Sequence, residues 1–253
     1  MFAVLYGVIV YVLFLGTIGY LIGFSGNLGV PKSIDSGTAG PLAEAVIVDL
    51  LLLGAFAAQH SVMARRSFKR WWTRIVPQPV ERSTFVLFAS LLLLLLYWQW
   101  RPIGAPIWTV TDPAFGTILH LLFWAGWTTV FISSFLINHF ELFGVSQVLA
   151  HESGRELSPP RLSTPGLYRY VRHPLYLGFL LAFWAAPVMT GGHLLFAAVI
   201  TGYVLLAIWF EERDLIAQFG ERYRRYREQA GMLLPKPSRA SLEEAPGPDR
   251  TLT

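Results

Sequence analysis

The segment from Tyr168 to Arg213 reads YRYVRHPLYLGFLLAFWAAPVMTGGHLLFAAVITGYVLLAIWFEER and places a long apolar block between two charged ends. Arg172 and His173 precede the block, and Glu211 and Glu212 follow it. A charge near the hydrocarbon core of a bilayer costs about 3 kcal/mol unless it is paired, hydrated or able to reach the surface. The two ends therefore suggest one shared polar pocket at the membrane surface, which we interpret as a binding site.

The composition of the whole chain is that of an integral membrane protein. Of its 253 residues, 54% are hydrophobic and 14% are charged, whereas soluble domains carry about 25% charged residues. Four further apolar blocks approach the roughly 20 residues that a helix needs to cross the hydrocarbon. They run from about Phe2 to Phe24, Leu42 to Met63, Thr84 to Trp100 and Phe115 to Ile137. The absence of cysteine excludes disulfides, thiolate metal ligands and a cysteine nucleophile, and no metal site is predicted.

The last apolar block, Leu175 to Phe210, is too long for one helix across a core of about 30 Å. Pro187 and the pair Gly191-Gly192 lie near its middle, so we expect two helices of about 15 to 18 residues joined by a tight turn. These would be thin spans or a hairpin dipping into the far leaflet. The expected fold is an all-α bundle of five to six transmembrane helices, the last two forming a broken hairpin, plus a cytosolic amphipathic C-terminal helix.

The distribution of cations predicts the orientation. All lysines and arginines except Lys32 and Arg101 fall within residues 64–83, within 139–173 or after Phe210. Because Lys and Arg concentrate in cytoplasmic loops, both termini and the polar pocket are predicted to face the cytosol from the cell's inner (plasma) membrane. The net charge of +4 then reflects topology rather than nucleic-acid binding.

The chain divides into three predicted parts. Residues 1–137 would form four transmembrane helices with a basic cytosolic loop at 64–83. Residues 138–234 would form a cofactor-binding core with a connector, the hairpin 174–210 and the amphipathic helix 211–230, because apolar positions in 214–229 recur at helical spacing. The tail 235–253 is rich in proline and charge and is expected to be disordered.

The charged ends of the last block suit a zwitterionic ligand. Pro174 favours the first turn of a helix, so Arg172 and His173 would stand at a helix N-terminus whose free N–H groups attract a carboxylate. Gly178 would lie on the same face and let a ligand or another backbone approach closely. The acidic pair 211–212 suits an amine, a sulfonium or ribose hydroxyls. S-adenosylmethionine carries all of these groups.

The motifs themselves resemble a known superfamily. GLYR at 166–169 with RHPLYLG at 172–178 resembles the signature of the isoprenylcysteine carboxyl methyltransferase superfamily of membrane methyltransferases. The acidic pair and FGERYRRY at 219–226 resemble its second half. The resemblance implies S-adenosylmethionine as methyl donor and S-adenosylhomocysteine as product. It implies that the donor is bound by Tyr168, Arg172, His173, Tyr176, Gly178, Glu211 and Glu212.

Three upstream segments, QHSVMAR at 59–65, PVERS at 79–83 and NHFELFG at 138–144, look more like the methanethiol S-methyltransferase branch, near the NnrU-like proteins. This implies conversion of methanethiol, a small thiol partner, to dimethyl sulfide by in-line methyl transfer. Candidates for the proton acceptor or thiolate stabiliser are His60, His139 and Glu141. A histidine is attractive because its pKa lies near cytosolic pH.

Other interpretations remain open at this stage. The acceptor could be a lipid, such as a prenylcysteine carboxylate or an amino headgroup, which a wide lateral gap between helices would favour. A small closed cavity around His60 and His139 would favour methanethiol. A non-catalytic NnrU-like membrane protein is a third alternative. Arg172 could also simply snorkel to lipid phosphates, and the two glutamates could belong to a structural ion network.

Overall fold

The computed structural model describes residues 1–157, 159 and 161–236, so the prediction for the tail 235–253 lies almost entirely outside the described residues. Five helices are long and apolar enough to cross a membrane, and α8 (Pro174–Trp184) is a shorter apolar helix. The five are α1 (Phe2–Gly26), α2 (Leu42–Ala64), α4 (Gln78–Gln99), α5 (Pro113–Leu136) and α9 (Gly191–Phe219). The predicted multi-pass helical bundle is confirmed.

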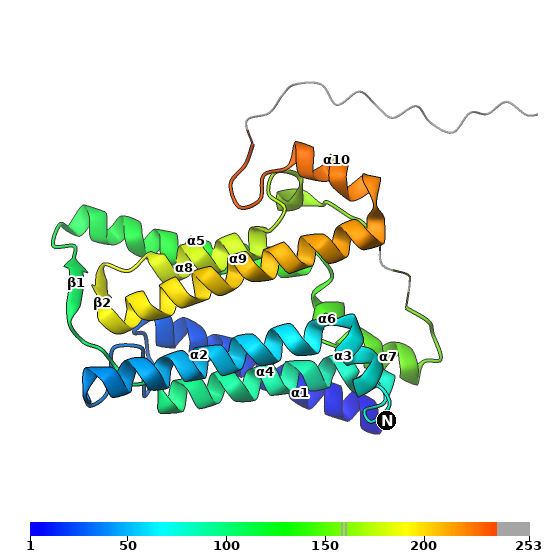
Figure 1. Cartoon of the computed structure of the whole chain (residues 1–253), viewed down its shortest axis with the longest axis horizontal. Helices are drawn as coiled ribbons and strands as arrows, with labels where there is room; N and C mark the ends of the chain where they lie inside the picture. Colours follow the sequence, from blue (N-terminus) through cyan, green and yellow to red (C-terminus); the bar gives the residue numbers. More distant parts are fainter. Residues whose placement is uncertain (158, 160, 237–253) are drawn as a thin grey trace, which may run out of the picture.

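The helices form two layers that run between two poles of the molecule (Figure 1). One layer holds α1, α2 and α4, and the other holds α5, α8 and α9. At one pole lie the N-terminus, α3 (Arg66–Trp72), α6 (His139–Leu142), α7 (Val145–Glu152) and α10 (Glu221–Gln229). We call this the basic pole, since it gathers the arginine-rich segments that the sequence analysis placed on one side of the membrane.

The opposite pole is closed by a small antiparallel sheet that was not predicted. Strand β1 (Pro106–Thr109) precedes α5, and strand β2 (Val188–Thr190) lies between α8 and α9. Pro106 pairs with Thr190, and Thr109 pairs with Val188. The chain after α8 therefore reaches the pole opposite the one where α8 begins, although α8 itself has only 11 residues.

The predicted break in the last apolar block is real, but the two expected helices of about 15 to 18 residues are wrong. Helix α8 ends at Trp184, shortly before Pro187, and α9 has 29 residues. Gly191 and Gly192 begin α9 rather than interrupt it, because the hydroxyl of Thr190 accepts a hydrogen bond from the N–H of His193 and caps the helix. Pro174 opens α8, as predicted.

The predicted amphipathic helix 211–230 is also corrected. Helix α9 continues through Glu211, Glu212 and Arg213 to Phe219, since these residue types favour helix. It ends at Gly220, whose φ of 57° and ψ of −128° are available only to glycine. The amphipathic segment α10 therefore begins at Glu221, and the acidic pair belongs to the long helix.

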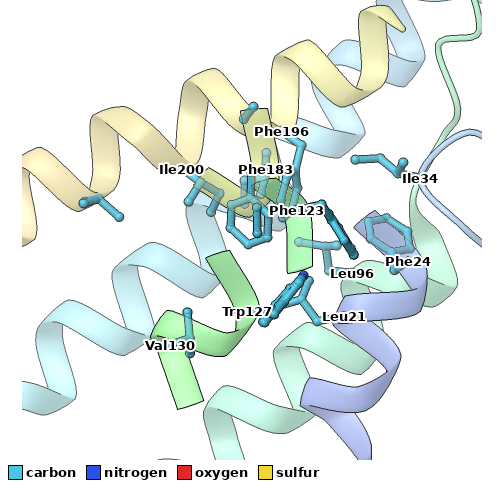
Figure 2. Packing of buried hydrophobic residues seen from close by; sticks show 14 of the residues in the cluster. Leu21, Phe24, Ile34, Leu96, Phe123, Trp127, Val130, Phe183, Phe196 and Ile200 are labelled. Carbon is cyan, nitrogen blue, oxygen red and sulfur yellow. The ribbon is translucent and has the colours of Figure 1, made fainter. Parts of the chain in front are cut away.

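An aromatic core joins the two layers. Phe24 and Leu96 of one layer meet Phe123, Phe183 and Phe196 of the other, all at most 5% exposed (Figure 2). Many large apolar side chains on the outer faces of the helices are exposed, among them Val12, Leu51, Leu121 and Phe131. An exposed apolar belt of this kind suits contact with lipid. The core and the belt together fix the polar groups at the poles.

Candidate functional site

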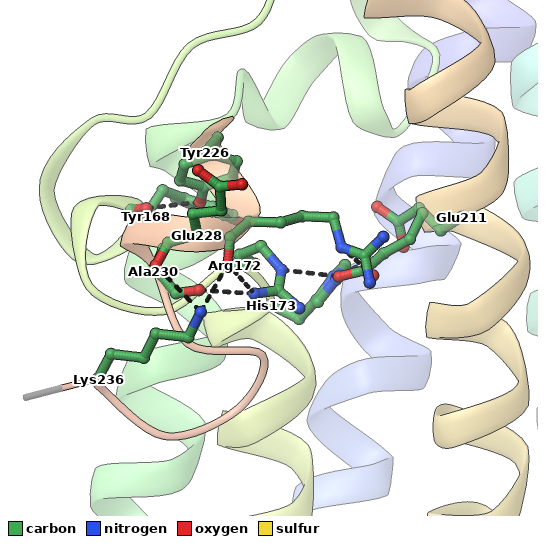
Figure 3. A network of polar contacts seen from close by, with 10 residues as sticks. Tyr168, Arg172, His173, Glu211, Tyr226, Glu228, Ala230 and Lys236 are labelled. Atoms are coloured by element: carbon green, nitrogen blue, oxygen red, sulfur yellow. Dashed lines mark hydrogen bonds and ion pairs between the residues drawn. The ribbon is translucent and has the colours of Figure 1, made fainter. Parts of the chain in front are cut away.

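A buried ion network at the basic pole unites the two charged ends of the last apolar block (Figure 3). The Nε of Arg172 donates to Oε1 of Glu212 at 2.7 Å, and Nε2 of His173 lies 3.2 Å from the same oxygen. The Nε of Arg227, on α10, lies 3.1 Å from Oε2 of Glu212. The side chains of Arg172 and Glu212 are only 7% and 9% exposed. The Glu212 carboxylate therefore neutralises two arginines from separate segments of the chain and also lies within hydrogen-bond distance of His173.

The segment after α10 closes over this network. The backbone N–H of Arg172 donates to Gly231 at 2.7 Å, and that of His173 donates to Met232 at 3.2 Å. The Nη1 of Arg172 donates to the carbonyls of Ala230 at 2.6 Å and Arg227 at 3.2 Å. Most donors of Arg172 are thus engaged within the protein. This part of the network has the character of the structural ion network that the sequence analysis left open.

Glu211 and Tyr176 form the accessible side of the cluster. The Tyr176 hydroxyl donates to Oε2 of Glu211 at 3.1 Å, and Nδ1 of His173 lies 3.9 Å from that oxygen. The Glu211 side chain is 46% exposed, in contrast to its buried neighbour Glu212. The two adjacent glutamates therefore differ: one anchors the fold, and the other retains acceptor capacity for a ligand.

Two tyrosines hold the 3₁₀ helix η1 (Gly166–Arg169) against α10 and α5. The Tyr226 hydroxyl donates to the carbonyl of Tyr168 at 2.5 Å, and the Tyr168 hydroxyl donates to the carbonyl of Ser133 at 3.4 Å. Burial raises the pKa of Tyr226 to about 12, against an opposing effect of Arg172. Burial also raises the pKa of Tyr168. Both phenols are neutral donors at physiological pH, and Tyr168 borders the network without joining it.

Gly178 has a packing role. A Cβ at this position would lie 2.7 Å from the carbonyl oxygen of Gly126 and 2.8 Å from the N–H nitrogen of Val130, both on α5. Of the two possibilities raised by the sequence, close approach of another backbone is the one the structure contains. Gly178 is therefore a packing residue between α8 and α5 and is not among the proposed donor contacts.

The two candidate histidines lie in different clusters. His60, on α2, has its ring 4.8 Å from the ring of Phe85 and 6.4 Å from that of Tyr203. Its Nδ1 is buried and has no hydrogen-bond partner within the described part of the chain. A buried nitrogen without a partner costs free energy, so this position favours a chemical role for His60.

His139 is anchored instead. Its Nε2 lies 2.8 Å from the hydroxyl of Tyr11, its Nδ1 lies 2.8 Å from the hydroxyl of Ser134, and its ring stacks on Phe135 at 4.2 Å. Burial lowers the pKa of His139, so the imidazole is neutral. Glu141, the third candidate, accepts a hydrogen bond from Nδ2 of Asn138 at 2.6 Å. These contacts account for His139 as a structural residue. His139 and His60 have different neighbours and do not form one cluster.

A polar side chain that the sequence analysis did not single out, Arg82, lies near His60 in the first turns of α4. Its Nε donates to the carbonyl of Leu142 at 2.7 Å, and its guanidinium carbon lies 4.8 Å from the centre of the Phe85 ring. In the sequence, Arg82 is one of the cations of residues 64–83 that predict the orientation in the membrane. The available signal was its place in PVERS at 79–83, one of the segments that resemble the methanethiol S-methyltransferase branch.

A cavity of about 560 Å³ adjoins the network on the side of α10. It is lined by Arg172, Arg224, Arg227, Glu228, Met232 and Lys236. A second cavity, of about 350 Å³, lies at the opposite pole beside Lys32 and Arg101. Only the first borders the residues of the candidate site, and its cationic lining suits an anionic group. Within the described residues, no group of three or more His, Asp or Glu side chains could hold a metal ion.

Residues 114–222 match the family model described as phospholipid methyltransferase. Together with the five apolar helices, this match identifies a multi-pass membrane methyltransferase. Three similar proteins carry a more specific name. The chain is 59% identical to methanethiol S-methyltransferase 1 of Bradyrhizobium diazoefficiens, over 92% of this chain and 82% of that one. It is 56% identical to methanethiol S-methyltransferase of Mycobacterium tuberculosis, over 93% and 97% of the two chains.

The third, methanethiol S-methyltransferase of Crocosphaera subtropica, is 52% identical over 92% of both chains. The chain belongs to the methanethiol S-methyltransferase family. No solved structure gives a significant match. The resemblance of residues 59–65, 79–83 and 138–144 to this branch is thereby confirmed.

Proposed function

We propose that this enzyme transfers a methyl group from S-adenosylmethionine to methanethiol, giving dimethyl sulfide and S-adenosylhomocysteine. The observation that carries the proposal is the convergence of Tyr176 and Glu211 beside the buried Arg172–Glu212–His173 network. These residues lie within the part of the chain that matches a methyltransferase family model. The thiol acceptor follows from the printed names of the relatives, which cover most of the chain.

The residues present fit such a donor. Glu211 retains acceptor capacity for an amine, a sulfonium or ribose hydroxyls, and Tyr176 adds a phenol beside it. The N-terminus of α8 has no side-chain cap, so its first N–H groups remain available to a carboxylate. Arg172, His173 and Glu212 hold these elements together and keep positive charge near the helix start. The donor itself supplies an electrophilic methyl group on sulfur.

We further propose that the basic pole faces the cytosol from the inner (plasma) membrane. A polar nucleotide donor would enter from the aqueous side at this pole. A small apolar thiol would partition into the bilayer and approach between the helices. Residues 138–234 carry the donor site in this assignment, and α2 and α4 border the acceptor.

The decisive experiment uses the purified protein in nanodiscs with methanethiol and methyl-labelled S-adenosylmethionine. We expect labelled dimethyl sulfide in the headspace and an equal amount of S-adenosylhomocysteine. Tyr176→Phe should weaken binding of S-adenosylhomocysteine by about tenfold, since a hydrogen bond to a carboxylate contributes about 1.5 kcal/mol. Tyr170→Phe is the matched control, because the side chain of Tyr170 is exposed.

A lipid acceptor is the second candidate, favoured by the description of the family model that matches residues 114–222. With a lipid acceptor the headspace would stay unlabelled, and label would appear in extracted lipid. Binding of S-adenosylhomocysteine without any labelled product in either phase would contradict both assignments of the acceptor.

A further inference from the structure

The guanidinium of Arg82 occupies an unusual position for a membrane arginine. It belongs to the first turns of α4, and its side chain is partly buried at the basic pole. One donor, Nε, is fixed by the carbonyl of Leu142 at 2.7 Å. Its Nη groups form no hydrogen bond and no ion pair within 4 Å in the described residues, and they are not fully buried. Four N–H donors are thus left for water or a ligand.

The surroundings of Arg82 connect the two parts of the proposed site. The Phe85 ring packs against the Arg82 guanidinium at 4.8 Å and against the His60 ring at 4.8 Å. Arg82 is within electrostatic range of His60 and of Glu81, Glu141 and Tyr176. Arg82 is therefore near both His60 and the tyrosine that holds Glu211.

A guanidinium in this position meets the chemical need of a thiol acceptor. The nucleophile in methyl transfer to sulfur is the thiolate, while a simple thiol such as that of cysteine ionises only near pH 8.5. A fixed cation in an apolar pocket favours the thiolate and costs little reorganisation during the reaction. His60 offers a buried Nδ1 without a partner, and its ring lies 4.8 Å from the same Phe85 ring.

We propose that Arg82 binds the methyl acceptor as its thiolate and directs the sulfur at the donor methyl group, with the neutral His60 holding the incoming thiol through the unpartnered Nδ1. This deepens the proposed function and rests on it. In the step, the S–H bond breaks and its proton passes to water. The thiolate lone pair then forms a bond to the methyl carbon, while the electrons of the donor's C–S bond return to the donor sulfur.

The test compares Arg82→Gln, Arg82→Lys and wild type in nanodiscs, with Arg74→Gln as the matched control, because Arg74 is exposed. Four quantities are measured: the melting temperature, the affinity for S-adenosylhomocysteine, kcat/KM for methanethiol, and the dependence of kcat/KM on pH from 6 to 10. We expect Arg82→Gln to lower kcat/KM by about 100-fold, similar to loss of one donor in an oxyanion hole. Its remaining activity should keep rising with pH where the wild type levels off.

Arg82→Lys restores the charge without the fork, so it should recover part of the activity and a profile nearer to wild type. Donor affinity and the melting temperature should stay close to wild type in Arg82→Lys. A purely structural arginine predicts the reverse, with lower melting temperature or donor affinity and an unchanged pH profile. That result, or wild-type kcat/KM in Arg82→Gln, would overturn this assignment alone. Absence of dimethyl sulfide from the wild type would overturn the proposed function as well.

Discussion

The same substitution should have different effects at Glu211 and Glu212. At Glu212 it should lower the stability of the fold, whereas at Glu211 it should lower the affinity for the donor. Glu212→Gln keeps the size of the side chain but removes the charge that faces Arg172 at 2.7 Å and Arg227 at 3.1 Å. The Arg172 side chain is only 7% exposed, so its charge would be left without a counterion. Loss of one partner from a buried pair costs about 3 kcal/mol, which corresponds to a decrease in melting temperature of about 6 to 12 °C.

Glu211→Gln should leave the fold nearly intact, since this side chain is 46% exposed and lies 3.9 Å from His173. A contact of 3.9 Å on a half-exposed carboxylate is a weak one, and its loss should cost about 0.5 kcal/mol. Donor affinity should instead fall about 10- to 100-fold, because a charge-assisted hydrogen bond contributes about 1.5 to 3 kcal/mol. Thermal unfolding followed by tryptophan fluorescence and titration calorimetry with S-adenosylhomocysteine give the two readouts. Equal melting temperatures for both variants, or equal donor affinities, would refute this division of roles.

Two further perturbations test the packing and the titration of the bundle. Gly178→Ala should lower the free energy of unfolding by about 1 to 3 kcal/mol, since its Cβ would lie 2.7 Å from the Gly126 carbonyl oxygen. Gly54→Ala, where nothing lies within 4 Å, should stabilise α2 instead, and equal melting temperatures for the two variants would contradict the steric argument. Acidification should destabilise the fold as the pH falls below 6.5, because burial lowers the pKa of His139 from that value and the unfolded state binds the proton first. His139→Asn should flatten the pH dependence of thermal unfolding, and an unaltered slope would speak against this source.

The sequence predicted the parts of the fold that depend on hydrophobic length. Helices of about 20 apolar residues are visible from composition alone, and Pro174 marked the start of α8. The lengths of α8 and α9 were not predictable in the same way. The chain after α8 is held by pairing of Val188 with Thr109, a contact between residues far apart in the sequence. A local helix-breaking signal such as Gly191-Gly192 carries no information about that pairing partner.

The candidate site shows the same division between local and distant information. The motifs correctly indicated that Arg172 and His173 would approach the acidic pair, since all stand at the ends of one apolar block. They could not separate Glu211 from Glu212, because neighbouring residues on a helix point about 100° apart and only the packing of α10 decides which one is buried. They also could not place Arg82 near Tyr176, which depends on how the two layers meet.

The arrangement of the two layers explains why the chain matches two descriptions of different scope. The phospholipid methyltransferase model covers residues 114–222, which include Tyr176 and Glu211 of the proposed donor site. His60 and Arg82 lie upstream of that match, whereas the relatives named for methanethiol align over 92% of the chain. A donor half shared across the family and an acceptor half supplied by α2 and α4 would produce this pattern. Acceptor specificity would then depend on the layer of α2 and α4, where the Phe85 ring lies 4.8 Å from both the His60 ring and the guanidinium carbon of Arg82.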